Sequence, residues 1–140
     1  MACMEMKMAD ETRAMAAERR AEGRKVLVVE DEVIIAMVIE DTLLELGVEI
    51  VGPVESLDAA LRLAREAPID AAVLDVNIRG GNSYSVADVL DERGIPFVLC
   101  SGHGDLALGE RHRHRPRLTK PYSMRALGDQ VLELLKTPRG

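Results

Sequence analysis

The chain has 140 residues, a net charge of −6 and 47% hydrophobic residues, but only two Tyr, one Phe and no Trp. So few aromatic side chains exclude a stacking platform for single-stranded nucleic acid, and the acidic balance gives a poor field for binding phosphate backbones. The chain is too apolar to be disordered, and its length fits one domain with a sizeable core. We therefore expect no nucleic-acid partner.

Membrane insertion and secretion are not expected either. The longest uninterrupted apolar run, Val33–Ile39, is far shorter than the roughly 20 residues that a spanning helix needs. The N-terminus lacks the apolar stretch of a signal peptide, and Cys3 and Cys100 lie too far apart in the chain to suggest a disulfide framework. These features favour a reducing, cytoplasmic location.

Residues 1–24 differ from the rest of the chain, because they hold five of the seven Met residues and no Val, Ile or Leu. Two interpretations stay open: a flexible extension, which we favour because termini are loose unless tied down, and a helical arm that docks on a partner. The pattern places the folded domain at 25–136 and a short tail at 137–140.

From Lys25 onward, short apolar runs alternate with segments of helical periodicity. Strands are predicted at 26–29, 48–54, 71–75, 96–100 and 117–119. Helices are predicted at 33–46, 57–67, 83–93, weakly at 105–110, and at 124–136, with Ser56 and Ser123 as N-caps and a loop at 80–82. Five such units predict an α/β domain with a doubly wound parallel sheet.

Polar side chains stand where the predicted strands end. Glu30 and Asp31 follow the first strand, Asp75 ends the third, Ser101 follows the fourth and Lys120 follows the fifth. These positions meet at one edge of a parallel sheet, where ligands bind. Three carboxylates so close together repel unless a cation neutralises them, and oxygen ligands suit Mg²⁺.

That combination predicts aspartyl phosphorylation. A carboxylate beside the metal can attack phosphorus and form an acyl phosphate, while a hydroxyl and an ammonium neutralise charge on the phosphoryl oxygens. Glu30 and Asp31 could instead only cap the first helix, where acids favour the N-terminal dipole. Capping does not account for Asp75 together with Ser101 and Lys120.

Four motifs carry a family resemblance. They are Val28-Val29-Glu30-Asp31-Glu32, Val73-Leu74-Asp75, Val98-Leu99-Cys100-Ser101-Gly102 and Leu118-Thr119-Lys120-Pro121-Tyr122. In this order, at the ends of strands one, three, four and five, they make the chain from Lys25 to about Leu135 resemble the receiver domain of bacterial two-component response regulators. The resemblance implies a flavodoxin-like (βα)5 fold with strand order 2-1-3-4-5.

The resemblance also implies roles for individual residues. Asp75 would take a phosphoryl group from a phosphohistidine on a sensor histidine kinase or phosphotransfer protein, Ser101 would bond a phosphoryl oxygen, and Lys120 would pair with the phosphoryl group. Glu30, Asp31, Asp75 and the backbone carbonyl of Asn77 would hold Mg²⁺. The Lys120–Pro121 bond would be cis, as an X-Pro bond allows.

Three positions modulate the family pattern or depart from it. His103 and Asn77 stand where receivers tune the lifetime of the phosphoryl group; the His103 imidazole either orders water there or only fills the rim. Arg117 replaces the aromatic switch residue that most receivers carry. The chain is similar to a subgroup of stand-alone receivers from alphaproteobacteria that lack this aromatic residue.

The basic run Arg111–Arg117 is interpreted as a solvated loop or a docking patch for an acidic partner. His103, His112, His114 and Cys100 match no common zinc spacing. Cys100 is expected in the core and Tyr122 at the edge of the site.

The leading hypothesis is a single-domain response regulator that is phosphorylated without being a turnover enzyme. It would signal by protein contact or act as a phosphate sink, since no output domain follows. The alternatives are a pseudo-receiver that acts as a binding scaffold and a haloacid-dehalogenase-like phosphatase. The phosphatase would need a second Asp where Asn77 stands.

Overall fold

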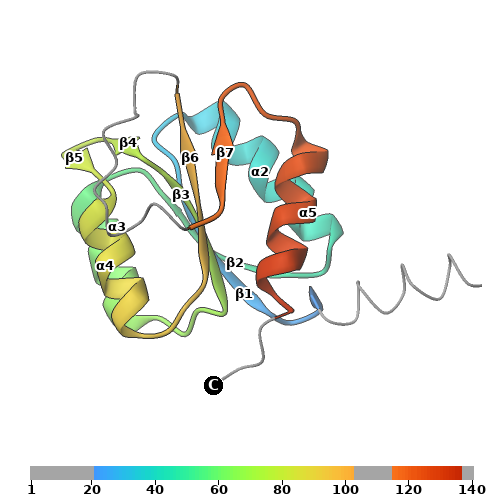
Figure 1. Ribbon diagram of the computed structural model, residues 1–140, viewed down its shortest axis with the longest axis horizontal. Helices are drawn as coiled ribbons and strands as arrows, with labels where there is room; N and C mark the ends of the chain where they lie inside the picture. Colours follow the sequence, from blue (N-terminus) through green and yellow to red (C-terminus); the bar gives the residue numbers. More distant parts are fainter. Residues whose placement is uncertain (1–20, 103–114, 137–140) are drawn as a thin grey trace, which may run out of the picture.

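The computed structural model describes residues 21–102 and 115–136, which form a parallel sheet between two helical layers (Figure 1). The sheet has five strands in the order β2-β1-β3-β6-β7. Their bounds are β1 Lys25–Val29, β2 Glu49–Val54, β3 Ala71–Asp75, β6 Phe97–Ser101 and β7 Arg117–Thr119. Every neighbouring pair in this sheet is parallel, which confirms the predicted flavodoxin-like order 2-1-3-4-5.

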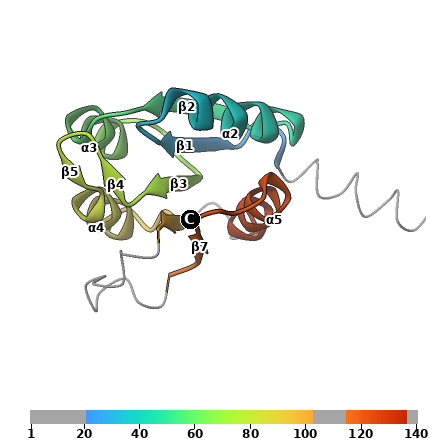
Figure 2. The ribbon, with the colours of Figure 1, turned by 90° about the horizontal axis from the view of Figure 1, so that it is seen from above.

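Four helices cover the sheet in the part of the chain that the structure describes. They are α2 Val33–Glu45, α3 Leu57–Glu66, α4 Tyr84–Glu92 and α5 Met124–Leu134. Seen from above, α2 and α5 lie on one side of the sheet and α3 and α4 on the other (Figure 2). The predicted caps are confirmed: Ser56 Oγ accepts from the Ala59 N–H at 3.3 Å, and Ser123 Oγ from the Ala126 N–H at 3.0 Å. The helix predicted at 105–110 lies outside the described residues.

The central strands are buried on both faces, which is why they consist of continuous apolar runs. One core, under α3 and α4, gathers around Leu27, Leu74 and Phe97. The other, under α2 and α5, gathers around Val28 and Val98. No helix among residues 21–102 and 115–136 is long and apolar enough to cross a membrane.

The loop predicted at 80–82 is wrong in part, because this stretch contributes a strand to a small antiparallel ribbon. Strand β4 Asn77–Ile78 pairs with β5 Gly81–Asn82. Gly80 and Gly81 have φ values of 97° and 141°, which a residue with a side chain rarely adopts, so they permit this tight reversal. The Arg79 carbonyl accepts from the Leu57 N–H at 2.9 Å, which ties the ribbon to the start of α3.

The packed fold already includes the residues just before Lys25. Ala21 is fully buried in the core under α2 and α5. The Gly23 N–H donates to the Gly47 carbonyl at 3.1 Å, and Arg24 forms an ion pair with Asp70. The sequence of residues 1–24 did not predict this packing, because it contains no Val, Ile or Leu and the buried side chain is a single Ala.

Candidate functional site

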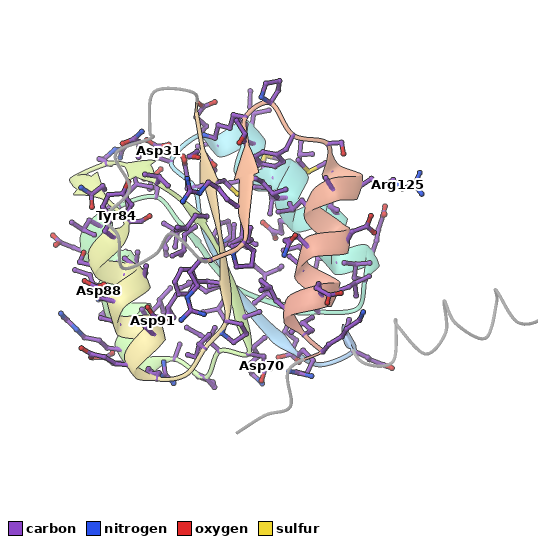
Figure 3. The ribbon with its side chains drawn as sticks, in the orientation of Figure 1. Asp31, Asp70, Tyr84, Asp88, Asp91 and Arg125 are labelled. Carbon is purple, nitrogen blue, oxygen red and sulfur yellow. The ribbon has the colours of Figure 1, made fainter. Side chains whose placement is uncertain are left out.

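Three carboxylates converge at the carboxyl edge of the sheet. Glu30, Asp31 and Asp75 each offer an oxygen, and these oxygens lie within 4.8 Å of one another. Glu30 and Asp75 are 2% and 4% exposed, whereas Asp31 is half-buried and lies at this edge in Figure 3. The predicted cluster of acids is therefore present, with one member open to solvent.

The predicted ammonium joins the same cluster. Lys120 Nζ lies 3.2 Å from Asp75 Oδ1, and the Lys120–Pro121 bond is cis as expected. Ser101, at the end of β6, is 4% exposed, and its carbonyl accepts from the Lys120 N–H at 2.7 Å. Because β6 lies between β3 and β7, this backbone bond fixes where Lys120 enters the site.

The acids do not serve as caps of α2. The N-cap of this helix is Glu32, which makes no side-chain capping bond, and the first turn contains no acid. Instead, the Glu32 N–H donates to Glu30 Oε1 at 3.1 Å, which holds the Glu30 carboxylate beside Asp75. The capping interpretation of Glu30 and Asp31 therefore does not describe this site.

Burial and mutual repulsion destabilise the ionised forms of the carboxyl groups in this cluster. Burial, together with the nearby Asp75 carboxylate, raises the pKa of Glu30 to about 7. Burial also raises the pKa of Asp75, although Lys120 opposes the shift. Burial lowers the pKa of Lys120, but attraction by Asp75 outweighs this effect and the pKa is raised. One ammonium thus does not fully compensate the carboxylates, and a divalent cation would.

The donor set fits Mg²⁺. All three side chains offer carboxylate oxygens, which hard cations prefer, and the half-buried Asp31 leaves the cluster open on one side. Asn77, whose backbone carbonyl is expected in this set only because of the family resemblance, is exposed at the start of β4, two residues beyond Asp75.

The remaining predicted residues lie in different surroundings. Arg117 is half-buried on β7, where it is paired in register with Leu99. Cys100 is 1% exposed in the core, and burial raises the pKa of its thiol to about 12. Tyr122 packs against the same core, and burial raises the pKa of its phenol. His103, His112 and His114 lie outside the described residues.

A pocket of about 440 Å³ lies beside Glu30 and was not predicted from the sequence. Its lining includes Glu30, Val33 and Met37 on one side and Pro53, Glu55 and Ser56 on the other. The Gly52–Pro53 bond is cis, and the pairing of β1 with β2 is irregular at this point. The dipeptide Gly52-Pro53 was the only available signal in the sequence, and it indicates a turn without predicting a cavity.

Known proteins are similar to this chain in sequence and in structure. The family model of the response regulator receiver domain matches residues 26–131. The chain belongs to this family. As a receiver domain, it is a component of two-component signalling, and its acid cluster occupies the expected edge of the sheet.

Two curated relatives of the receiver domain are longer proteins. A probable transcriptional regulator ycf27 of Cyanophora paradoxa is 30% identical over 117 residues, which are 81% of this chain and 48% of the relative. The transcriptional regulatory protein PdtaR of Mycobacterium tuberculosis is 32% identical over 105 residues, which are 72% of this chain and 51% of the relative. The chain thus spans about half the length of these relatives.

Solved structures match the receiver domain over nearly their whole length. SdrG of Sphingomonas melonis Fr1 is 42% identical with a TM-score of 0.69, covering 82% of this chain and 98% of SdrG. A response regulator receiver protein of Sinorhizobium medicae WSM419 is 27% identical with a TM-score of 0.72, covering 83% and 97%. Another structure of SdrG, at 44% identity, shows its BeF3-activated conformation.

Proposed function

We propose that this receiver domain is a Mg²⁺-dependent phosphoacceptor that takes a phosphoryl group on Asp75 from a phosphohistidine of a sensor histidine kinase or phosphotransfer protein. The observation that carries the proposal is the 3.2 Å pairing of Lys120 with Asp75 inside a cluster of three carboxylates. Membership of the receiver family supports it, and the BeF3-activated form of SdrG shows that a relative responds to a phosphoryl mimic.

Each residue of the proposed site has a separate role in the phosphoryl transfer. A carboxylate oxygen of Asp75 attacks phosphorus as the bond between phosphorus and the donor imidazole breaks, so an acyl phosphate forms. The imidazole leaves with the bonding electron pair and takes up a proton from solvent, which makes it neutral. Lys120 and the Ser101 hydroxyl stabilise charge on the phosphoryl oxygens. Glu30, Asp31, Asp75 and the Asn77 carbonyl would hold Mg²⁺, which neutralises the attacking carboxylate and the incoming phosphoryl group.

The output of this reaction is a change in protein contacts or the removal of phosphoryl groups from a kinase, and the domain is not a turnover enzyme. A phosphatase of the haloacid-dehalogenase type would need an acid at position 77, where this chain has an exposed Asn. No observation among the described residues favours that alternative.

The proposal is tested by phosphotransfer from a histidine kinase domain that carries labelled phosphohistidine. Label should move to the wild-type chain in Mg²⁺ and stay on the kinase when the chain carries Asp75→Asn. A pseudo-receiver would take no label in either form, yet would bind its partner equally well with Asp75→Ala.

A further inference from the structure

The hydroxyl of Tyr122 is buried and has no hydrogen-bond partner among residues 21–102 and 115–136. The side chain packs against the core under α2 and α5, so the fold encloses the hydroxyl and water does not reach it. A Phe would fill nearly the same space without leaving a buried polar group unpaired, which costs free energy. Such unpaired groups are uncommon in folded proteins. The fold therefore contains a buried donor that its own hydrogen bonds do not use.

Strand alternation brings the acids of the site to the same side of the sheet as this hydroxyl. Val28 and Val73 belong to the core under α2 and α5, and Glu30 and Asp75 follow them by two residues each. Because successive side chains point to opposite faces of a strand, residues two apart share a face. The Glu30 N–H donates at 3.0 Å to the carbonyl of the last residue of β2, so the pairing of β1 extends as far as Glu30.

The ionisation of Tyr122 reflects the same neighbours. Burial is the main cause of the raised pKa of its phenol, and the Cys100 thiol and the carboxylates of Glu30 and Asp75 add to the shift. A thiol is a weak hydrogen-bond acceptor, whereas an ionised carboxylate is a strong one. Of the groups that act on this donor, the acids of the site are therefore the acceptors that suit it best.

Glu30 has the greater need of a further donor. The Asp75 carboxylate is already paired with the Lys120 ammonium at 3.2 Å, whereas Glu30 Oε1 accepts from the backbone N–H of Glu32 at 3.1 Å. Glu30 is 2% exposed, so water contributes little to its hydrogen bonding. Carboxylates that hold a metal are usually hydrogen-bonded by surrounding residues, which fix their orientation.

We propose that Tyr122 is a positioning residue of the Mg²⁺ site, whose hydroxyl donates to the Glu30 carboxylate when that carboxylate holds Mg²⁺. Glu30 is ionised when it holds the ion, and an ionised carboxylate accepts a hydrogen bond more strongly than a neutral carboxyl group does. Binding of the ion and the bond from Tyr122 therefore reinforce each other. This inference rests on the proposed function, because it requires the acids to bind Mg²⁺.

Tyr122→Phe removes the hydroxyl and keeps the ring. Tyr84→Phe is the matched control, because Tyr84 begins α4, on the opposite side of the sheet from α5 (Figures 2 and 3). Calorimetric titration of the full chain with MgCl₂ should give a dissociation constant about tenfold larger for Tyr122→Phe than for the wild type. Tyr84→Phe should bind Mg²⁺ as the wild type does. In EDTA, urea unfolding should show that Tyr122→Phe is at least as stable as the wild type, since it loses an unpaired hydroxyl.

The outcomes separate this role from a structural one. Equal Mg²⁺ affinities of Tyr122→Phe and the wild type would overturn the proposal. So would a loss of affinity accompanied by a loss of stability in EDTA, because the hydroxyl would then support the fold. Cys100→Ala should keep the wild-type affinity, and a loss that matches that of Tyr122→Phe would assign the effect to the thiol instead. A wild-type chain that bound no Mg²⁺ would overturn the proposed function itself.

Discussion

The ammonium of Lys120 lies 3.2 Å from the Asp75 carboxylate, although their strands, β7 and β3, are separated in the sheet by β6. The backbone bond from Lys120 to Ser101 makes this reach possible, because it holds the end of β7 against the end of β6. A cation is thus already placed where negative charge would develop on a phosphoryl group bound at Asp75.

Replacing this cation should slow phosphorylation while leaving the fold intact. Lys120→Ala removes a charged donor from the site, and losses of this kind reduce rates by about 10²-fold. Rates of phosphotransfer from a labelled kinase domain at saturating Mg²⁺ measure the effect, with Lys136→Ala as a surface control, since Lys136 is exposed and pairs with exposed Glu133. Equal rates for the wild type and Lys120→Ala would contradict the assigned role.

Stability without divalent cations should fall as the pH rises from about 4.5 to about 7. Glu30 has a raised pKa in the fold, so the folded state holds a proton that the unfolded state releases over this range. Glu30→Gln keeps the acceptor for the Glu32 N–H and removes the titration. Urea unfolding in EDTA should show that this variant gains about 1–3 kcal/mol over the wild type at pH 8 and little at pH 4. A constant difference between the two proteins would argue against the shift.

Mg²⁺ should stabilise the domain by binding the folded state alone. A ligand at about 100 times its dissociation constant adds about 2.7 kcal/mol, so the melting temperature should rise and saturate with Mg²⁺. Asp31→Ala should abolish most of the rise, because Asp31 is the most accessible member of the cluster. Asp58→Ala, an acid in the first turn of α3, should leave it unchanged. An equal rise in all three proteins would indicate a general salt effect.

Gly52 should tolerate no side chain. Its φ is 97°, and an added Cβ would lie 2.9 Å from the Val54 nitrogen and 3.1 Å from the Val28 carbonyl oxygen. Gly52→Ala should therefore destabilise the domain by about 3 kcal/mol in urea unfolding. Gly94→Ala is the matched control, because Gly94 has a φ of 69° and a Cβ added there would meet no atom within 4 Å. This substitution should lower the free energy of unfolding by about 1 kcal/mol. Similar losses for both would show that the contacts at Gly52 do not matter.

Much of the fold could be predicted because its central strands are continuous apolar runs that end in polar residues. The run Val26–Val29 leads into Glu30 and Asp31, and a parallel sheet then brings those acids to Asp75. The ribbon at Asn77–Asn82 could not be predicted in this way, since its strands are two residues long and carry no periodicity. The pocket beside Glu30 depends on how β2 departs from β1, which is a tertiary feature.

For single residues, the Ser123 cap could be predicted from the sequence and the packing of Ala21 could not. Ser123 was recognisable as a cap because its hydroxyl acts locally, within three residues. The packing of Ala21 was not, because a small side chain becomes part of a core only through neighbours that are distant in the chain. The role of Arg117 in place of an aromatic residue stays a prediction, and so does that of His103.

We infer that Asp75 is the phosphoacceptor and that its phosphorylation requires Mg²⁺. The most direct measurement is the intact mass of the chain after incubation with acetyl phosphate, with Mg²⁺ or with EDTA. We expect the addition of one phosphoryl group to the wild type in Mg²⁺, none in EDTA and none in Asp75→Asn. A phosphoryl group that persists in Asp75→Asn, or that forms equally well in EDTA, would contradict it.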